Sequence, residues 1–281
     1  MKPASPILSA HGRWALLATA ALAATAANAA PVSWNSAVNS NWNNGSNWTP
    51  PGVPASGDDV TIGDVPGTEG TRVTLDINDT VLTLNLQSGN EFDTDAFELI
   101  ATSASITGLD TELLVRPNNG GASDSFDVDF LDVTNNATVR MLGGRLEVDG
   151  NSGDGRLDVE SGATLIGYGN IDLEDAAPGS ESRFTLSGGT LSVGNATDGL
   201  LIFTDVARTL TINATDPDVT ADLDQGGSTV NLLASGTLDL NIPIVPASDP
   251  AFSSTMNLAR KSTLDVQDAW GFNGTMNVNT V

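Results

Sequence analysis

The sequence contains no cysteine and only one histidine, and these two shortages exclude several kinds of functional site. Without cysteine no disulfide can form, so apolar burial and backbone hydrogen bonds must stabilise the fold. The single histidine, His11, lies in an N-terminal segment with the features of a cleaved leader. The rest of the chain can build neither a Ser-His-Asp nor a Cys-His nucleophile system. Zinc, copper and non-haem iron sites of the usual His/Cys kinds are excluded for the same reason.

Positively charged residues are also scarce. The chain has 11 Lys and Arg against 35 Asp and Glu, which gives a formal net charge of −24 at pH 7. A surface this acidic repels nucleic acid and anionic lipid, so we expect no nucleic-acid partner. The sequence contains no phosphate-binding G-x-x-x-x-G-K-[ST] motif and no dinucleotide-binding G-x-G-x-x-G motif opening a helix, so we predict no cofactor.

The N-terminus has the layout of a secretory signal peptide. Lys2 and Arg13 precede a mostly apolar run over residues 14–26, and Ala27-Asn28-Ala29 places small residues at both positions of an A-x-A site. The run is too short to span a bilayer, which takes about 20 apolar residues, and no later stretch approaches that length. We predict a signal peptide over residues 1–29, no membrane insertion of the remaining chain, and a surface or extracellular location in a Gram-negative bacterium.

Helical periodicity is hard to find after the signal peptide. Apolar and polar residues instead alternate with period two in runs bounded by Gly, Asn, Asp and Ser, which is typical of half-buried β-strands. Clear runs cover residues 72–77, 81–86, 127–130, 156–159, 209–212 and 236–240. In each run Leu, Ile, Val and Phe, including Phe130, are predicted to face a core, while Thr, Asp and Asn face water. The sequence thus predicts an all-β fold.

A second pattern opens several strands: a pair that contains Gly or another small residue, then a polar residue, then Leu. The leucines that end it are Leu146, Leu165, Leu191, Leu238 and, more loosely, Leu264. Their spacing indicates repeats of about two dozen residues, a period typical of solenoids. Glycine would take a corner that needs a positive φ, and each leucine would enter the core above its counterpart in the coil below.

Two architectures can hold many short strands without helices. Parallel strands normally need a helical crossover, except in a β-helix, where the strands of the other faces make the connection. An antiparallel β-sandwich would show tight hairpin turns, yet neither Asn44-Gly45 nor Asn273-Gly274 lies cleanly between two alternating runs. We therefore predict a parallel β-helix, or β-solenoid, and keep the antiparallel β-sandwich as the alternative.

The ends of a β-helix expose sheet edges and core, and both must be covered. Residues 30–62 are predicted to form a Trp- and Asn-rich N-terminal cap, and residues 63–281 the β-helix repeats. The last residues have the pattern of another strand, turn and strand with no cap after them. We therefore expect the repeats to be incomplete at the C-terminus and to continue in a longer protein.

Two segments carry a family likeness. Trp34, Trp42 and Trp48, with the run 58–62 after them, resemble the segment that opens many large exported bacterial repeat proteins. Residues 162–171 resemble the recurring unit of autotransporter passengers and their β-strand repeats. This resemblance implies a single-stranded right-handed parallel β-helix with a role in adhesion, biofilm formation or surface display.

The tryptophans are the first candidate ligand site. Trp34, Trp42 and Trp48 lie among Asn, Ser and Gly, and aromatic faces can stack on sugar rings, so a glycan platform is one interpretation. The other is that the three indoles form the small core of the cap.

Asp-rich stretches are a second candidate, because calcium takes six to eight oxygen ligands. One group consists of Asp216, Asp218, Asp222 and Asp224, and a similar one of Asp124, Asp127, Asp129 and Asp132. Neither matches the EF-hand loop or the G-G-x-G-x-D repeat, so we predict no metal site. Alternating Asp residues are explained more simply as the solvent face of a strand.

Three functions remain open. The leading hypothesis is a non-catalytic, adhesin-like structural protein of the cell exterior that meets surface glycans or other cell-surface proteins. The second is a polysaccharide-active β-helix enzyme, a glycoside hydrolase or polysaccharide lyase that uses carboxylates only. Lys261 would serve as a base only with a pKa lowered by burial, and its neighbours indicate an exposed turn instead. The third is a carbohydrate-binding module without turnover.

Overall fold

The computed structural model describes residues 29–119, 124–149 and 155–174, and beyond them the segments 183–187, 189–193, 208–214, 220–225, 229–232, 236–241, 254–258, 263–266 and 274–278. Within these residues the chain is all-β, with 22 strands and one short 3₁₀ turn, η1 (Gly45–Asn47). The all-β class is confirmed. Most of the predicted signal peptide, including Ala27, lies outside the described residues, as do Asp216, Asp218 and Lys261.

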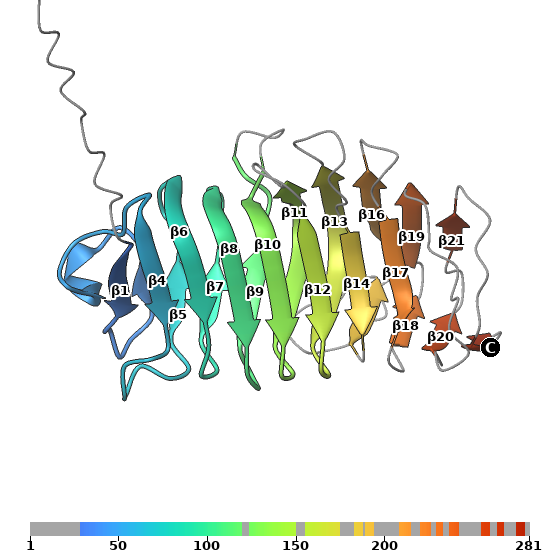
Figure 1. Cartoon of the computed structure of the whole chain (residues 1–281), viewed down its shortest axis with the longest axis horizontal. Helices are drawn as coiled ribbons and strands as arrows, with labels where there is room; N and C mark the ends of the chain where they lie inside the picture. The colour runs from blue at the N-terminus through green and yellow to red at the C-terminus, as the bar shows by residue number, and fades with distance from the viewer. Residues whose placement is uncertain are drawn as a thin grey trace, which may run out of the picture.

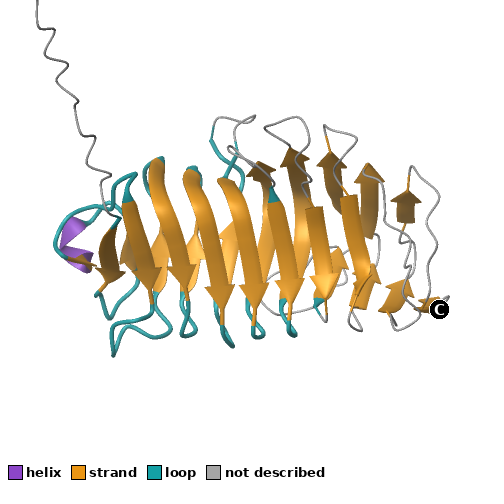
Figure 2. Cartoon of the chain, viewed as in Figure 1, coloured by secondary structure: helices purple, strands orange, loops and turns teal. Residues whose placement is uncertain are grey.

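All 22 strands belong to one hydrogen-bonded sheet that curls around a single core (Figures 1 and 2). The strands form three series, and within a series each strand pairs with one from the next round of the chain. The first series consists of β1 (Ala30–Trp34), β4 (Asp58–Ile62), β6 (Asp79–Leu86), β8 (Leu99–Thr107), β10 (Phe126–Thr134), β12 (Arg156–Glu160), β14 (Arg183–Ser187) and β17 (Thr220–Gln225).

The other two series share the longest strands, which bend and so contribute to both. The second series joins the first parts of β6, β8 and β10 to the second parts of β11 (Thr138–Asp149) and β13 (Thr164–Glu174), followed by β16 (Arg208–Ala214), β19 (Gly236–Asn241) and β21 (Thr263–Val266). The third series consists of β2 (Ser40–Asn41), β5 (Arg72–Thr74), β7 (Glu91–Asp93), β9 (Glu112–Val115), the first parts of β11 and β13, β15 (Thr190–Val193), β18 (Thr229–Leu232), β20 (Ser254–Leu258) and β22 (Gly274–Val278).

Strand direction corrects one part of the sequence prediction. β4, β6, β8, β10 and β12 run side by side in the same direction (Figure 1). At the N-terminal end, however, β1 pairs antiparallel with β3 (Trp48–Thr49), so the sheet is mixed and not purely parallel. The cause is local: the chain turns back through η1, and Trp34 lies opposite Trp48. Among the described strands this is the one antiparallel pair, so the hairpin pairing expected of a sandwich is confined to it.

Apolar side chains of successive strands are stacked in register to form the core. In the first series the stacked residues are Val60, Leu84, Ala104, Leu131 and Leu157, all of them buried. In the third series they are Phe92, Leu113, Val139, Leu165 and Leu191. Both columns belong to one hydrophobic cluster. Burial of a Val, Leu or Phe side chain contributes roughly 1.5–3 kcal/mol, so the stacked side chains of the two columns together are the main source of stability.

The leucines of the predicted repeat do not form one column. Leu165 lies opposite Leu191 in the third series, and Leu238 lies opposite Leu264 in the second. Leu146 instead lies opposite Ile171, in a different column of the second series. The pattern therefore marks strands that enter the core, and it marks equivalent positions of successive rounds in the pairs Leu165–Leu191 and Leu238–Leu264 but not from Leu146 to Leu165.

β10 turns a corner at Asp129, and this corner reverses one prediction. Val128 faces the core in the second series and Leu131 faces the core in the first, although the two are three residues apart. Strict alternation from Val128 would make Leu131 point outward. Because Leu131 faces the core instead, the corner shifts the alternation by one residue. Asp129 is consequently buried and Phe130 is 43 % exposed. The prediction that Phe130 faces the core is wrong.

Two stacked turns join the first series to the third. Asn135 and Asn136 follow β10 with φ of 54° and 65°, and Ser161 and Gly162 follow β12 with φ of 52° and 82°. The next residues, Ala137 and Ala163, are buried, and the amide of Thr164 donates to the Ala137 carbonyl at 2.9 Å. The prediction of a glycine with positive φ before Leu165 is confirmed.

Replacement of Gly162 by alanine should lower the free energy of unfolding by about 1–2 kcal/mol, because a Cβ is strained at this positive φ. Gly162→Asn should cost less, since Asn tolerates the left-handed region and occupies the matching position, Asn136, in the preceding turn. Urea unfolding followed by circular dichroism measures both variants. Gly57→Ala is the control, because a Cβ at Gly57 meets no atom within 4 Å. Equal losses for Gly162→Ala and Gly57→Ala would contradict the turn geometry.

Candidate functional site

The three cap tryptophans pack against one another. Trp34 and Trp48 have ring centroids 5.0 Å apart at an interplanar angle of 79°, and Trp42 and Trp48 lie 4.8 Å apart at 73°. Trp42 also meets Phe92 of β7 edge-on at 5.5 Å. All three indoles are fully buried. The cluster closes the N-terminal end of the hydrophobic core.

The indole nitrogens of the cluster differ in their hydrogen bonds. Trp42 Nε1 donates to Asp79 Oδ2 at 2.6 Å, and Trp48 Nε1 donates to the Trp42 carbonyl at 2.8 Å. Trp34 Nε1 is buried without a hydrogen-bond partner. Because no indole face is open to solvent, a sugar ring cannot stack on these residues as they are arranged. The trio is instead part of the hydrophobic core.

The pair Trp34→Phe and Trp48→Phe isolates the role of these hydrogen bonds, since both substitutions remove the same volume from the cap. Trp48→Phe also leaves the buried Trp42 carbonyl without its donor, a loss that typically costs about 1–3 kcal/mol. Trp34→Phe removes a donor that has no partner. Guanidinium unfolding followed by circular dichroism should therefore show Trp48→Phe to be less stable than Trp34→Phe by at least about 1 kcal/mol. The reverse order would contradict the cap geometry.

Every arginine whose side chain the structure describes takes part in an ion pair. Asp93 lies between Arg72 and Arg116, with Arg116 Nε 2.9 Å from Asp93 Oδ1. Arg140 Nε is 2.6 Å from Glu112 Oε1. Because these cations are already paired with carboxylates, the described surface offers no free basic patch to an anionic partner.

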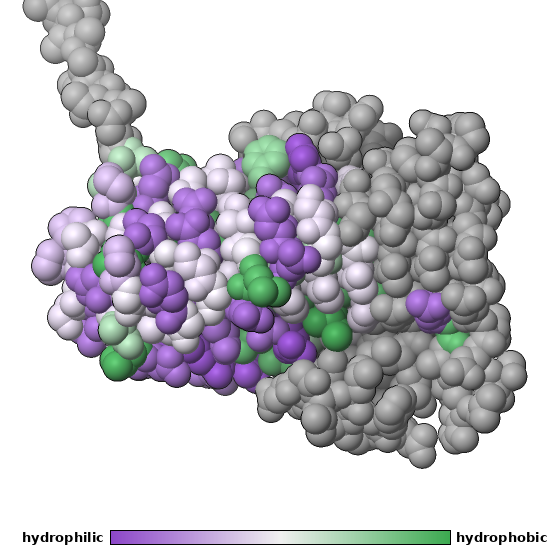
Figure 3. All heavy atoms as spheres, turned by 90° about the horizontal axis from the view of Figure 1, so that it is seen from below, coloured by the Kyte–Doolittle hydropathy of each residue, from purple (hydrophilic) through white to green (hydrophobic). Residues whose placement is uncertain are grey.

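Seen from below, that surface is mostly hydrophilic with small separate hydrophobic patches (Figure 3).

The described part of the chain holds no group of three or more His, Cys, Asp or Glu arranged to bind a metal ion. Asp124 is instead paired with Arg145, with Oδ1 and Nη1 2.6 Å apart. Asp222 and Asp224 lie in β17, where Asp222 is opposite Thr185 of β14. Their two predicted companions, Asp216 and Asp218, fall outside the described residues.

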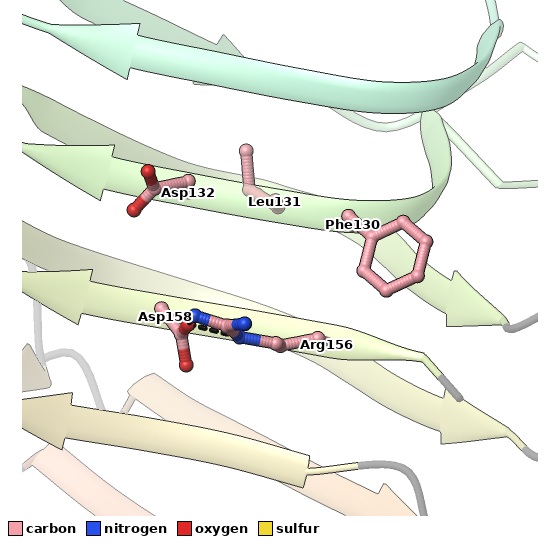
Figure 4. Close-up of a pocket in the computed structure, with 5 residues that line it drawn as sticks. All are labelled: Phe130, Leu131, Asp132, Arg156 and Asp158. Carbon is pink, nitrogen blue, oxygen red and sulfur yellow. Dashed lines mark hydrogen bonds and ion pairs between the residues drawn. The ribbon is translucent and has the colours of Figure 1, made fainter. Parts of the chain in front are cut away.

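A shallow hollow of about 250 Å³ lies on the outer face of β10 and β12. Its lining residues are Phe130, Leu131, Asp132, Arg156 and Asp158, drawn in Figure 4. The parallel register sets this arrangement, because Phe130 lies opposite Arg156 and Asp132 lies opposite Asp158. An aromatic ring, a guanidinium group and two carboxylates are thereby brought together on two neighbouring strands.

The charged groups of the hollow are not equivalent. Arg156 donates from Nε to Oδ2 of Asp158, and its Nη2 forms an ion pair with the same oxygen. The side chain of Asp158 is only 2 % exposed. The other oxygen, Asp158 Oδ1, is buried without a hydrogen-bond partner. Burial, followed by the negative charge of Asp158, raises the pKa of Asp132, and Arg156 partly offsets the rise. The hollow therefore lies over a buried, unpaired acceptor, and it holds an exposed carboxyl that protonates more readily than usual.

Sequence reasoning did not group these residues. The sequence patterns give Asp132 as a solvent-facing strand residue or, less simply, a calcium ligand, and they assign Phe130 to the core. The available signal was the run Leu131-Asp132-Val133, whose apolar residues fix the phase of the second part of β10 and require Phe130 to point outward. Arg156 could be placed beside Phe130 only once the register was known.

The raised pKa of Asp132 makes stability depend on pH. Because the folded protein holds this proton more tightly than the unfolded chain, the group favours folding at low pH, and this contribution is lost as the pH rises through the raised pKa. Asp132→Asn should therefore be more stable than the wild-type chain at pH 7, by a margin that shrinks as the pH falls toward about 4. Melting temperatures across this range test the prediction, with Asp110→Asn on an exposed turn as the control. A margin independent of pH would contradict it.

Comparison with known proteins identifies no relative: the chain matches no protein-family model, no curated protein and no solved structure. In the part of the chain that the structure describes, no helix has the length and apolar character needed to cross a membrane.

Proposed function

We propose that the curled sheet is wound as a single right-handed parallel β-helix of the autotransporter-passenger kind, with residues 30–62 as its cap. The three series of parallel pairs support this winding, because the chain between two partners of one series passes through strands of the other two. The right-handed sense is the one that about 98 % of crossovers between parallel strands adopt. The antiparallel β1–β3 pair belongs to the cap and leaves the winding of the later strands unaffected.

The protein is a non-catalytic, adhesin-like structural element of the cell exterior in this proposal. The observation that carries it is the unbroken stacking of strands from β1 to β22 around one core, which makes an extended particle with long outer faces (Figure 1). An extended particle with a polar surface is suited to display and contact. The leader-like segment 1–29, the missing catalytic bases and the likeness to autotransporter passengers support the same role.

Surface labelling of living cells tests this proposal. The full chain is expressed in a Gram-negative bacterium with an epitope tag inserted at Leu109, which is 69 % exposed in the turn between β8 and β9. Antibody should label intact cells, and mass spectrometry should find the mature chain beginning at Ala30. A chain that lacks residues 1–29 is the control and should be labelled only after lysis. Labelling of the full chain only after lysis would overturn the proposal.

A further inference from the structure

We propose that the hollow around Phe130 binds a neutral carbohydrate chain, with the Phe130 ring as its stacking platform. The inference rests on the proposed non-catalytic surface role and names the class of ligand that this role would engage. It moves the glycan site from the buried tryptophans of the cap to the outer face of the first series.

The first argument is the exposure of an aromatic ring. Among the side chains that the structure describes, three large hydrophobic ones are exposed, Val38, Leu109 and Phe130, and of these only Phe130 is aromatic. Phe130 lies within a sheet face, between Ser103 of β8 and Arg156 of β12, where a polar side chain would be the ordinary choice. The apolar face of a pyranose ring is the natural partner of such a ring.

The second argument is the set of polar groups that line the same hollow as the ring (Figure 4). Sugar hydroxyls both donate and accept hydrogen bonds. The exposed carboxylate of Asp132 can accept them, and the half-exposed guanidinium of Arg156 can donate. Two carboxylates against one guanidinium disfavour an anionic sugar, so the class is a neutral one.

The third argument is the surface beside the hollow. On the β8 and β6 side, the outward positions in register with Asp132 are Ser105 and Asn85. These hydroxyl and amide groups continue the polar face from strand to strand, at about 4.8 Å per strand. A chain laid along the long axis of the particle would contact several of them, so the ligand is an oligosaccharide and not a single sugar.

The carboxylates are not arranged for turnover. Hydrolysis of a glycosidic bond needs two accessible carboxyl groups on opposite sides of the bond. Asp158 is 2 % exposed and engaged by Arg156, so it can neither attack a sugar nor activate a water in this arrangement. Binding without cleavage is the expected outcome.

Calorimetric titration of the purified full chain tests the site. The probes are soluble hexasaccharides of glucose and of mannose, with an oligogalacturonate as the anionic comparison. At least one neutral probe should bind, and Phe130→Ala should weaken its binding about tenfold or more, as the loss of an aromatic anchor typically does. Phe130→Tyr should retain binding because it keeps the ring. Leu109→Ala, which removes an exposed apolar residue from outside the hollow, should bind like the wild-type chain.

Several results would overturn the carbohydrate site: no heat with any neutral probe at millimolar concentration, unchanged binding by Phe130→Ala, preference for the oligogalacturonate, or release of new reducing ends. Each leaves the surface role standing if intact cells are still labelled. Neutral-sugar binding by a chain that is not displayed would instead retain the site and remove the surface role.

Discussion

The structure depends on parallel backbone hydrogen bonds that hold each strand in register with its counterpart one round earlier. The register decides which side chains lie above one another, and it places Val60, Leu84, Ala104 and Leu131 in one buried column. A slip of one residue would turn this column to the solvent and bring polar residues inside. Because the chain has no disulfide and, within the described residues, no helix longer than the three-residue η1, the column and its hydrogen bonds carry the stability of the fold.

The corners of the sheet matter as much as its strands. At Asp129 the chain passes from the second series to the first, and the change of phase pushes Phe130 to the surface. The register then adds Arg156 and Asp158 from the next strand. The candidate site is thus a product of one corner and one pairing, and it is built on a sheet face instead of a loop. Such a site is held rigidly, which lowers the entropy that a ligand loses on binding.

The sequence predicts much of the fold because alternation is a local property. The runs 72–77, 81–86 and 156–159 contain β-strands most of whose apolar residues are buried, and the tryptophans of residues 30–62 are buried in the hydrophobic core. The pairing of those strands depends on residues 19 or more positions apart, such as Arg72 and Glu91, which alternation does not specify. The leucine pattern therefore indicates strands that enter the core, but its leucines belong to three different columns, as Leu146, Leu165 and Leu238 show. The hollow was missed for the same reason, since no local pattern places Phe130 beside Arg156.

Disulfide trapping tests the register most directly, because the chain has no cysteine of its own. Asn85 and Ser105 lie opposite each other on β6 and β8, at about the 4.8 Å spacing of paired strands, which is within the range of a disulfide. The double variant Asn85→Cys, Ser105→Cys should therefore cross-link on mild oxidation, as seen by electrophoresis without reductant. Asn85→Cys with Thr107→Cys, roughly 8 Å apart on the diagonal, should stay reduced. Equal cross-linking of the two pairs, or cross-linking of the second alone, would contradict the stacked parallel register.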